Sequence, residues 1–233
     1  MKIFALLSLL LGAVASYKYV IFVPNMANSQ TQFCARVAEV LANGGHDVTM
    51  LFVTHLSDFK TDVKIPKGVK SYHLDAFIEG ITKQSIEKEQ AAMMFKETGL
   101  KDMPAMMAMF GRFGKMLQEG CRSVIRNKEF MKWLENEKFD VAYAYIYSTC
   151  PIGLIHAAKI PSWVWLNSGP LMDYVAETTG VPIIPSYVPP VMMESHDNVF
   201  RCGNPDFREE LNDPSFPHTM DIGAKCPLVC FQH

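Results

Sequence analysis

Hydrophobic and polar positions between residues 19 and 53 predict a strand, a helix and a second strand in succession. Apolar runs at residues 19–23 and 48–53 are short enough for buried strands, and Pro24 bounds the first of them. Between the runs, apolar residues recur at the spacing of one helix face, at Phe33, Val37, Val40 and Leu41. The stretch therefore predicts a βαβ unit.

The connections in this unit are short, so its two strands should be parallel. We expect Asn28 or Ser29 to cap the helix, and Gly44-Gly45 to end it. Ligands of parallel sheets lie beyond the carboxyl ends of the strands. The loop at residues 24–30 is therefore the predicted functional site.

Further along the chain, three more strands are expected at residues 69–74, 141–146 and 162–166. Residues 85–137 show a helical pattern that Pro104 interrupts, with a last helix near residues 121–136. We also expect Trp163 and Trp165 in the core, on opposite faces of the sheet. The order of elements predicts an α/β fold, a Rossmann-like doubly wound parallel sheet.

Three segments divide the chain. Residues 1–16 read as a secretory signal peptide, because Lys2 precedes an apolar stretch and small residues follow it. That stretch is too short to span a membrane, and no other segment is long enough. Residues 17–190 are predicted to form the Rossmann-like domain. Residues 191–233 are a proline-rich tail, expected to be an incomplete continuation of that domain.

Composition and charge narrow the function. The 233 residues are 49% apolar and 20% charged, and the formal net charge of −2 gives no sign of a nucleic-acid partner. Six cysteines are widely spaced, without histidines in zinc-binding patterns, so no metal site is expected. The loop at residues 24–30 contains no glycine, which argues against a bound dinucleotide.

Several motifs together resemble the UDP-glucuronosyltransferases. They are the Pro-x-Met-x-x-Ser loop at residues 24–29, Gly-Gly-His-Asp-Val-Thr at 44–49, the helix-to-strand passage at 121–141, Pro-Ser-Tyr-Val-Pro at 185–189, and Lys-Cys-Pro-Leu-Val at 225–229. The resemblance implies the amino-terminal domain of a two-domain GT-B glycosyltransferase, with the donor-binding half and its membrane anchor missing.

The resemblance also implies a function and its partners. The family transfers a sugar from a UDP-sugar, UDP-glucuronate or UDP-glucose, to a hydroxyl of a small lipophilic acceptor such as a phenol or steroid. This half would bind the acceptor and no cofactor, with the UDP-sugar held by the missing half. The expected location is the lumen of the endoplasmic reticulum. Homo- or hetero-association with other transferase chains is left open.

The catalytic positions of the resembled family are altered here. Its general base is a histidine at the start of the first helix, supported by an aspartate on the fourth strand. Those positions correspond to Gln30 and Tyr145 in this sequence. A neutral amide has no useful basicity, and a tyrosine does not stabilise an imidazolium as a carboxylate does. His55, just beyond the second strand, could substitute, although a solvent-exposed loop histidine is the favoured interpretation.

Acceptor binding is assigned to two regions, the first helix and a methionine-rich segment at residues 91–116. Unbranched methionine side chains adapt to many apolar shapes. The candidate acceptor-binding residues are Ser29, Phe33, Met106 and Met107. Ordinary helix packing explains the methionines equally well.

Two hypotheses result. In the first, the chain is the acceptor-binding half of a UDP-glucuronosyltransferase-like protein and is inactive alone. In the second, it is a non-catalytic module that binds lipophilic molecules or regulates intact transferases. The altered positions 30 and 145 favour the second hypothesis, and the family-like scaffold favours the first.

Overall fold

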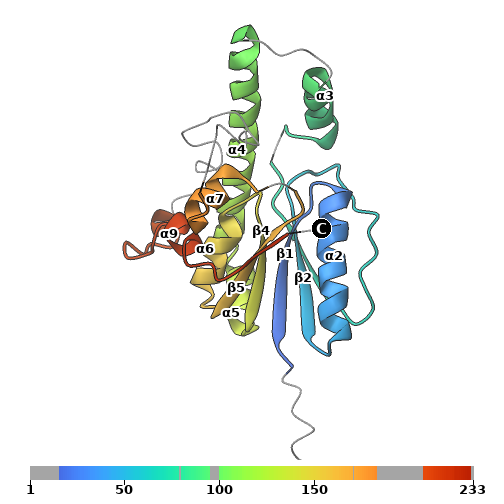
Figure 1. Ribbon diagram of the computed structural model, residues 1–233, viewed down its shortest axis with the longest axis vertical. Helices are drawn as coiled ribbons and strands as arrows, with labels where there is room; N and C mark the ends of the chain where they lie inside the picture. The colour runs from blue at the N-terminus through green and yellow to red at the C-terminus, as the bar shows by residue number, and fades with distance from the viewer. Residues whose placement is uncertain (1–15, 79, 95–99, 170, 183–206, 232–233) are drawn as a thin grey trace, which may run out of the picture.

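A computed structural model describes residues 16–78, 80–94, 100–169, 171–182 and 207–231 (Figure 1). Its centre is a six-stranded, fully parallel sheet in the order β3-β2-β1-β4-β5-β6. The strands are β1 (Lys18–Pro24), β2 (Asp47–Thr54), β3 (Lys70–Asp75), β4 (Val141–Tyr145), β5 (Ser162–Asn167) and β6 (Val229–Phe231). All five strands predicted from the sequence are present, and the α/β, Rossmann-like fold is confirmed.

Helices connect the strands and cover the sheet. They are α2 (Asn28–Asn43), α3 (Lys83–Met94), the 3₁₀ turn η1 (Leu100–Asp102), α4 (Met103–Arg126), α5 (Lys128–Asn136), α6 (Cys150–Ala157), α7 (Asp173–Thr179), α8 (Phe207–Glu210) and α9 (Thr219–Gly223). Phe33 of α2 contacts Tyr145, whereas Phe130 of α5 contacts Tyr72, whose strand register places it on the opposite face. The sheet is therefore wound on both sides.

Two local predictions about helices were wrong. Neither Asn28 nor Ser29 caps α2, because the cap position is Ala27 and no side chain caps the helix. The helix expected near residues 121–136 is two helices, because the side chain of Asn127 accepts a hydrogen bond from Phe130 N and starts α5. Gly44 ends α2 as expected.

The core is built on the central strands. Val20, Ile21, Phe22 and Val23 of β1 are all almost fully buried. Trp163 and Trp165 are buried as predicted, but their rings lie 5.6 Å apart in an edge contact. The expectation of opposite faces was wrong, because residues two apart on a strand point to the same face.

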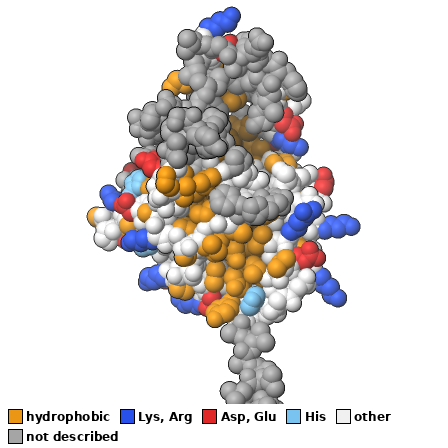
Figure 2. All heavy atoms as spheres, in the orientation of Figure 1, with side chains coloured by type: hydrophobic (Ala, Val, Ile, Leu, Met, Phe, Trp, Pro, Cys, Tyr) orange, Lys and Arg blue, Asp and Glu red, His pale blue; other side chains and the backbone are white. Residues whose placement is uncertain are grey.

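The face of the sheet that carries α2 keeps an apolar surface over β4 and β5. Tyr19, Tyr143 and Val164 share this face by strand register and are only partly buried. Figure 2, in the orientation of Figure 1, shows hydrophobic side chains gathered over the lower centre of the molecule. Parallel sheets are normally covered on both faces, so the part of the chain that the structure describes leaves this surface unusually open.

Residues 207–231 pack onto the domain. Phe207 is buried against α6, where a Cβ added to Gly153 would lie 2.2 Å from the phenyl ring. The carboxylate of Glu210 accepts hydrogen bonds from the guanidinium groups of Arg122 (3.0 Å) and Arg126 (2.8 Å) on α4. Residues 1–15, 185–189 and Cys202 lie outside the described residues.

We expect Phe207→Ala to detach this part of the tail. Removing a buried phenyl ring costs about 3–5 kcal/mol when the surroundings cannot collapse. Phe207 also stacks on Phe216, at 5.2 Å between ring centroids. Urea unfolding followed by circular dichroism would measure the loss. The neighbouring, exposed Glu209 provides the control, and equal losses for Glu209→Ala and Phe207→Ala would contradict this account.

Candidate functional site

A cavity of about 620 Å³ lies beyond the carboxyl ends of β1 and β2, at the edge predicted from the sequence. We call it the large cavity. It is lined by the start of α2, the loop after β2, the start of α3 and one face of α4. The lining residues are Met26, Ala27, Asn28, Gln30, Leu56, Phe59, Gly80, Ile81, Lys83, Ser85, Ile86, Glu87, Met109, Arg112, Phe113, Met116 and Tyr147.

Its apolar wall comes from helix periodicity. Met109, Phe113 and Met116 are spaced i, i+4 and i+7 on α4, so they share one face of that helix. Leu56 and Phe59 oppose them from the loop after β2, and Met116 belongs with both to one buried apolar cluster. A cavity of this size and character is typical of sites for small lipophilic ligands.

Asp58 anchors α3 as the outer wall of the cavity. Its carboxylate accepts hydrogen bonds from Lys83 N (2.7 Å) and Gln84 N (3.3 Å), the first amides of the helix. These bonds, that of Lys83 first, hold the pKa of Asp58 below its ordinary value. The Lys83 ammonium lies 5.3 Å from the centre of the Phe59 ring. The entrance of α3 is thus fixed to the loop that also lines the cavity.

Gln30, the predicted general-base position, lies in the wall of the large cavity. Its side-chain oxygen is buried and has no hydrogen-bond partner among the described residues. An unpaired buried carbonyl is costly and is usually satisfied by a ligand or water. Gln30 therefore brings an unsatisfied, buried oxygen next to the large cavity.

Tyr145, the other predicted position, is 2% exposed and does not line the large cavity. Its hydroxyl is hydrogen-bonded to that of Ser168, and its ring meets Phe33 edge-on at 6.4 Å. Burial raises the pKa of Tyr145 to about 12, so the hydroxyl stays protonated at neutral pH. The neighbouring Tyr147 lines the cavity in its place.

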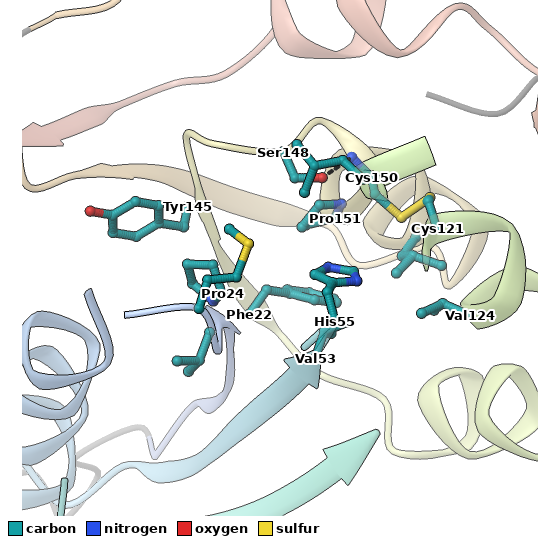
Figure 3. Close-up of a pocket in the computed structure, with 14 residues that line it drawn as sticks. Phe22, Pro24, Val53, His55, Cys121, Val124, Tyr145, Ser148, Cys150 and Pro151 are labelled. Carbon is teal, nitrogen blue, oxygen red and sulfur yellow. Dashed lines mark hydrogen bonds between the residues drawn. A yellow bond between two sulfur atoms is a disulfide. The ribbon is translucent and has the colours of Figure 1, made fainter. Parts of the chain in front are cut away.

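His55 is buried, not exposed to solvent as the favoured interpretation held. It lines a smaller cavity of about 40 Å³ with Tyr145, Ser148 and Pro151 (Figure 3). This space holds a few water molecules at most and is too small for an organic acceptor. Burial lowers the pKa of His55 to about 4, which makes it a weak base.

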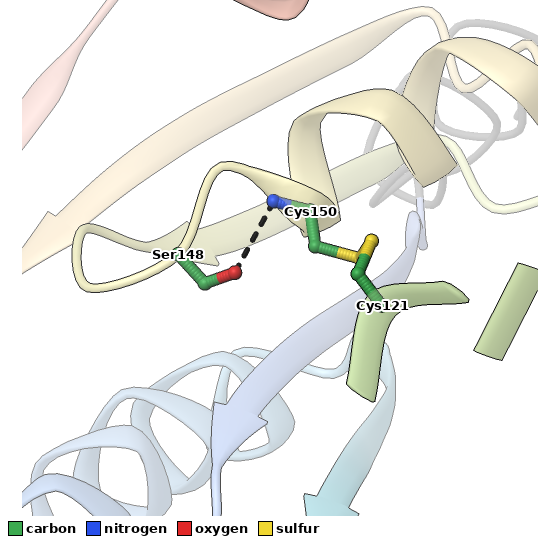
Figure 4. Close-up of a disulfide and its surroundings, with 3 residues drawn as sticks. All are labelled: Cys121, Ser148 and Cys150. Carbon is green, nitrogen blue, oxygen red and sulfur yellow. Dashed lines mark hydrogen bonds between the residues drawn. A yellow bond between two sulfur atoms is a disulfide. The ribbon is translucent and has the colours of Figure 1, made fainter. Parts of the chain in front are cut away.

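A disulfide between Cys121 of α4 and Cys150 at the start of α6 closes the smaller cavity (Figure 4). The two Cα atoms lie 5.9 Å apart, a usual separation for a disulfide. The hydroxyl of Ser148 accepts a hydrogen bond from Cys150 N (3.2 Å) at the same turn. Among the described cysteines, Cys34, Cys226 and Cys230 are free.

The predicted acceptor-binding residues lie mostly away from the cavity wall. Ser29 is exposed, Phe33 is in the core beneath Tyr145, and the Met107 side chain is 67% exposed. The side chain of Met106 lies outside the described part of the structure. Sequence reasoning overlooked Phe113, whose spacing from Met109 and Met116 on one helix face was a usable signal.

Two further findings concern the described residues only. No cluster of three histidine, cysteine or acidic side chains is arranged to hold a metal ion there. None of the helices that the structure describes combines the length and the apolar character needed to cross a membrane.

Comparison with known proteins gives relatives for most of the chain. A putative UDP-glucuronosyltransferase of Caenorhabditis elegans, ugt-60, is 28% identical over 182 residues, which cover 77% of this chain and 35% of the relative. Human UDP-glucuronosyltransferase 2B7 is 25% identical over 169 residues, covering 70% and 31%. The chain thus spans about a third of the length of these relatives.

Among solved structures, Glycyrrhiza uralensis UGT73P12 complexed with glycyrrhetinic acid 3-O-monoglucuronide matches with a TM-score of 0.36 and 13% identity. The match covers 71% of this chain and 30% of that one. The family model described as UDP-glucoronosyl and UDP-glucosyl transferase matches residues 19–203. That match begins in β1 and takes in five of the six strands together with α2 to α7. The chain therefore belongs to the family of UDP-glucoronosyl and UDP-glucosyl transferases.

Proposed function

We propose that this chain binds a small lipophilic molecule in the large cavity and is the acceptor-binding half of a glycosyltransferase-like protein. One observation carries the proposal: a cavity of about 620 Å³, lined mainly by apolar side chains, opens at the carboxyl edge of the sheet with Gln30 in its wall. Phenols and steroids combine the apolar surface and single hydroxyl that such a wall would accommodate.

Gln30 gives the site a preference for ligands that donate a hydrogen bond. In this proposal the Gln30 side chain turns its unpartnered, buried oxygen toward the cavity, where it accepts a hydrogen bond from a ligand hydroxyl. The amide is neutral in either orientation and does not remove the proton. The cavity would hold an alcohol or phenol in its unreactive, protonated form.

We infer that the chain alone transfers no sugar. The match covers only about a third of each relative, and in our proposal the UDP-sugar is held by the part of a relative that this chain does not match. The local reason is independent of length: Gln30 has no basicity, and the Tyr145 hydroxyl is engaged with Ser168.

The second hypothesis, a non-catalytic binding module, is favoured by the same two residues. A carrier or regulatory partner needs the cavity and no base. The Cys121–Cys150 disulfide supports the proposed routing through the secretory pathway, because disulfides persist in oxidising compartments. Transfer activity in full-length protein, absent from a carrier, separates the two hypotheses.

Ligand binding is tested on two residues of one helix. Phe113 lines the large cavity, whereas Met107 is exposed and does not. Replacing Phe113 with glutamine should weaken binding of 2-naphthol about tenfold, because apolar contact area worth ~1–2 kcal/mol is lost. Met107→Gln is the matched control and should leave the affinity unchanged. Fluorescence titration of 2-naphthol would measure both dissociation constants.

A second ligand tests the proposed hydrogen bond between Gln30 and the hydroxyl of 2-naphthol. 2-Methylnaphthalene has a similar shape and no hydroxyl, so it should bind more weakly than 2-naphthol. The difference should disappear in Gln30→Leu. No measurable binding of either compound, or equal effects of Phe113→Gln and Met107→Gln, would refute the assignment of the cavity as a ligand site.

A further inference from the structure

His55 joins the end of β2 to the middle of α4. Its imidazole hydrogen-bonds to the backbone of Ala76, whose N–H already donates to Thr54 O (2.9 Å). The Ala76 carbonyl is therefore the acceptor. Nδ1 has no partner among the described residues, so Nε2 carries the donated proton. The ring is thus held neutral, with the lone pair of Nδ1 left free.

Gly120 of α4 closes over that lone pair. A Cβ placed on Gly120 would lie 2.3 Å from Nδ1, so only glycine permits this approach. A proton added to Nδ1 would point into the backbone of α4, with no acceptor among the described residues. Accommodating the charged ring requires α4 and the loop after β2 to separate.

Among the residues that the structure describes, no carboxylate is recorded against the imidazole to compensate for a positive charge. The smaller cavity is lined by apolar side chains, the Cys121–Cys150 disulfide, the Ser148 hydroxyl and Tyr145, and only Tyr145 among these titrates. On α4, Glu119 flanks Gly120 but pairs with Arg122 (2.7 Å). Asp75, the last residue of β3, is exposed. Protonated His55 would therefore be a buried, unpaired cation, which proteins avoid.

The same contact forms part of the large cavity's wall. Leu56 follows His55 directly and lines the large cavity, and Met116 lies one helical turn before Gly120. Leu56 and Met116 pack together with Leu117 and Phe59 in one buried cluster. Separation of α4 from the loop after β2 would pull these two walls apart.

We propose that protonation of His55 in mild acid opens the contact between α4 and the loop after β2 and releases the ligand from the large cavity. Release rests on the proposed function, whereas the opening does not. Protonation of His55 would thus release a bound lipophilic molecule from the protein in an acidic compartment.

The direction and size of the effect follow from proton linkage. The pKa of His55 is about 4 in the closed form and has its ordinary value of 6.5 once the ring meets water. The stability of the closed form relative to the open form is therefore fully present above pH 6.5. It decreases as the pH falls from 6.5 toward 4. At pH 5 the opening equilibrium should have shifted by about 30-fold relative to neutral pH.

The opening can be measured without any ligand. Hydrogen–deuterium exchange of amides in residues 116–124, corrected for intrinsic exchange rates, should lose about 30-fold protection between pH 7.5 and pH 5. His55→Gln should abolish this loss, because glutamine does not titrate. His156→Gln, at an exposed histidine of α6, is the matched control and should behave as the native chain. The same loss of protection in His55→Gln would overturn the proposal.

Two more measurements complete the test. A neutral dye, 6-propionyl-2-dimethylaminonaphthalene, should bind more weakly at pH 5 than at pH 7.5, by up to about 30-fold, in the native chain only. Failure of the dye to bind at pH 7.5 would count against the proposed function, while the exchange result would still decide the opening. If His55→Gln does not fold, NMR titration of native His55 decides instead, and an ordinary pKa in the folded chain would overturn the proposal.

Discussion

A fusion of this chain to the sugar-nucleotide-binding part of an active relative should transfer sugar at least about 100-fold faster after Gln30→His and Tyr145→Asp than before them. The imidazole would stand in the wall of the large cavity, within reach of a ligand hydroxyl. Its pKa near neutrality suits removal of that proton, and general base catalysis supplies about 100- to 10,000-fold. Radiolabelled transfer to 2-naphthol would measure the gain.

The structure adds a condition to this expectation. Tyr145 is buried against Phe33 and is not in the wall of the large cavity, so Tyr145→Asp places a carboxylate in the core. We expect a lower melting temperature for the double variant and a smaller gain from Gln30→His alone. The unfused double variant should remain inactive, since donor and acceptor are not held together. Robust transfer by the native 233-residue chain would refute both the site and its proposed defect.

Loss of the Cys121–Cys150 disulfide should lower the free energy of unfolding by about 3–4 kcal/mol. The two cysteines are 29 residues apart, so the bond removes considerable freedom from the unfolded chain. It also ties α4 to α6 beside the smaller cavity. Guanidinium unfolding of the Cys121→Ser, Cys150→Ser double variant would measure the loss.

A cysteine outside this bond provides the control. Cys226 is free, and its thiol donates to the Leu228 carbonyl (3.2 Å), a bond that serine can also make. Cys226→Ser should therefore change the stability little. A reducing agent should destabilise the native chain and leave the double variant unaffected. If reduction has no effect on the native chain, the proposed stabilisation is wrong.

Sequence patterns sufficed for the fold because strand and helix periodicities here are long and bounded by clear breaks. The run at residues 19–23 and the helix face at Phe33 were enough to predict the βαβ unit and the edge that bears the site. The break at Asn127 was missed, since periodicity continues across it and only a side-chain cap separates the two helices.

The sequence predicted the edge of the sheet at which the large cavity lies more accurately than it predicted the residues that line this cavity. Position 30 lies in the cavity wall, whereas Phe33, one turn further on, turns into the core. Local spacing does not reveal which helix faces meet across a cavity. The burial of His55 also escaped prediction, because it depends on Gly120, which lies 65 residues away in the chain.

The central position of β1 has a consequence for synthesis of the chain. β1 pairs with β2 and β4, and Asp140, directly before β4, accepts a hydrogen bond from Lys18 N across 122 residues. Ribosomes add about 5–20 residues per second, so the edge of β1 that pairs with β4 stays unpaired for on the order of ten seconds during synthesis. During that time an apolar strand with unpaired amides is exposed on the nascent chain. A chaperone that binds extended apolar segments would therefore be expected to protect β1 until β4 emerges.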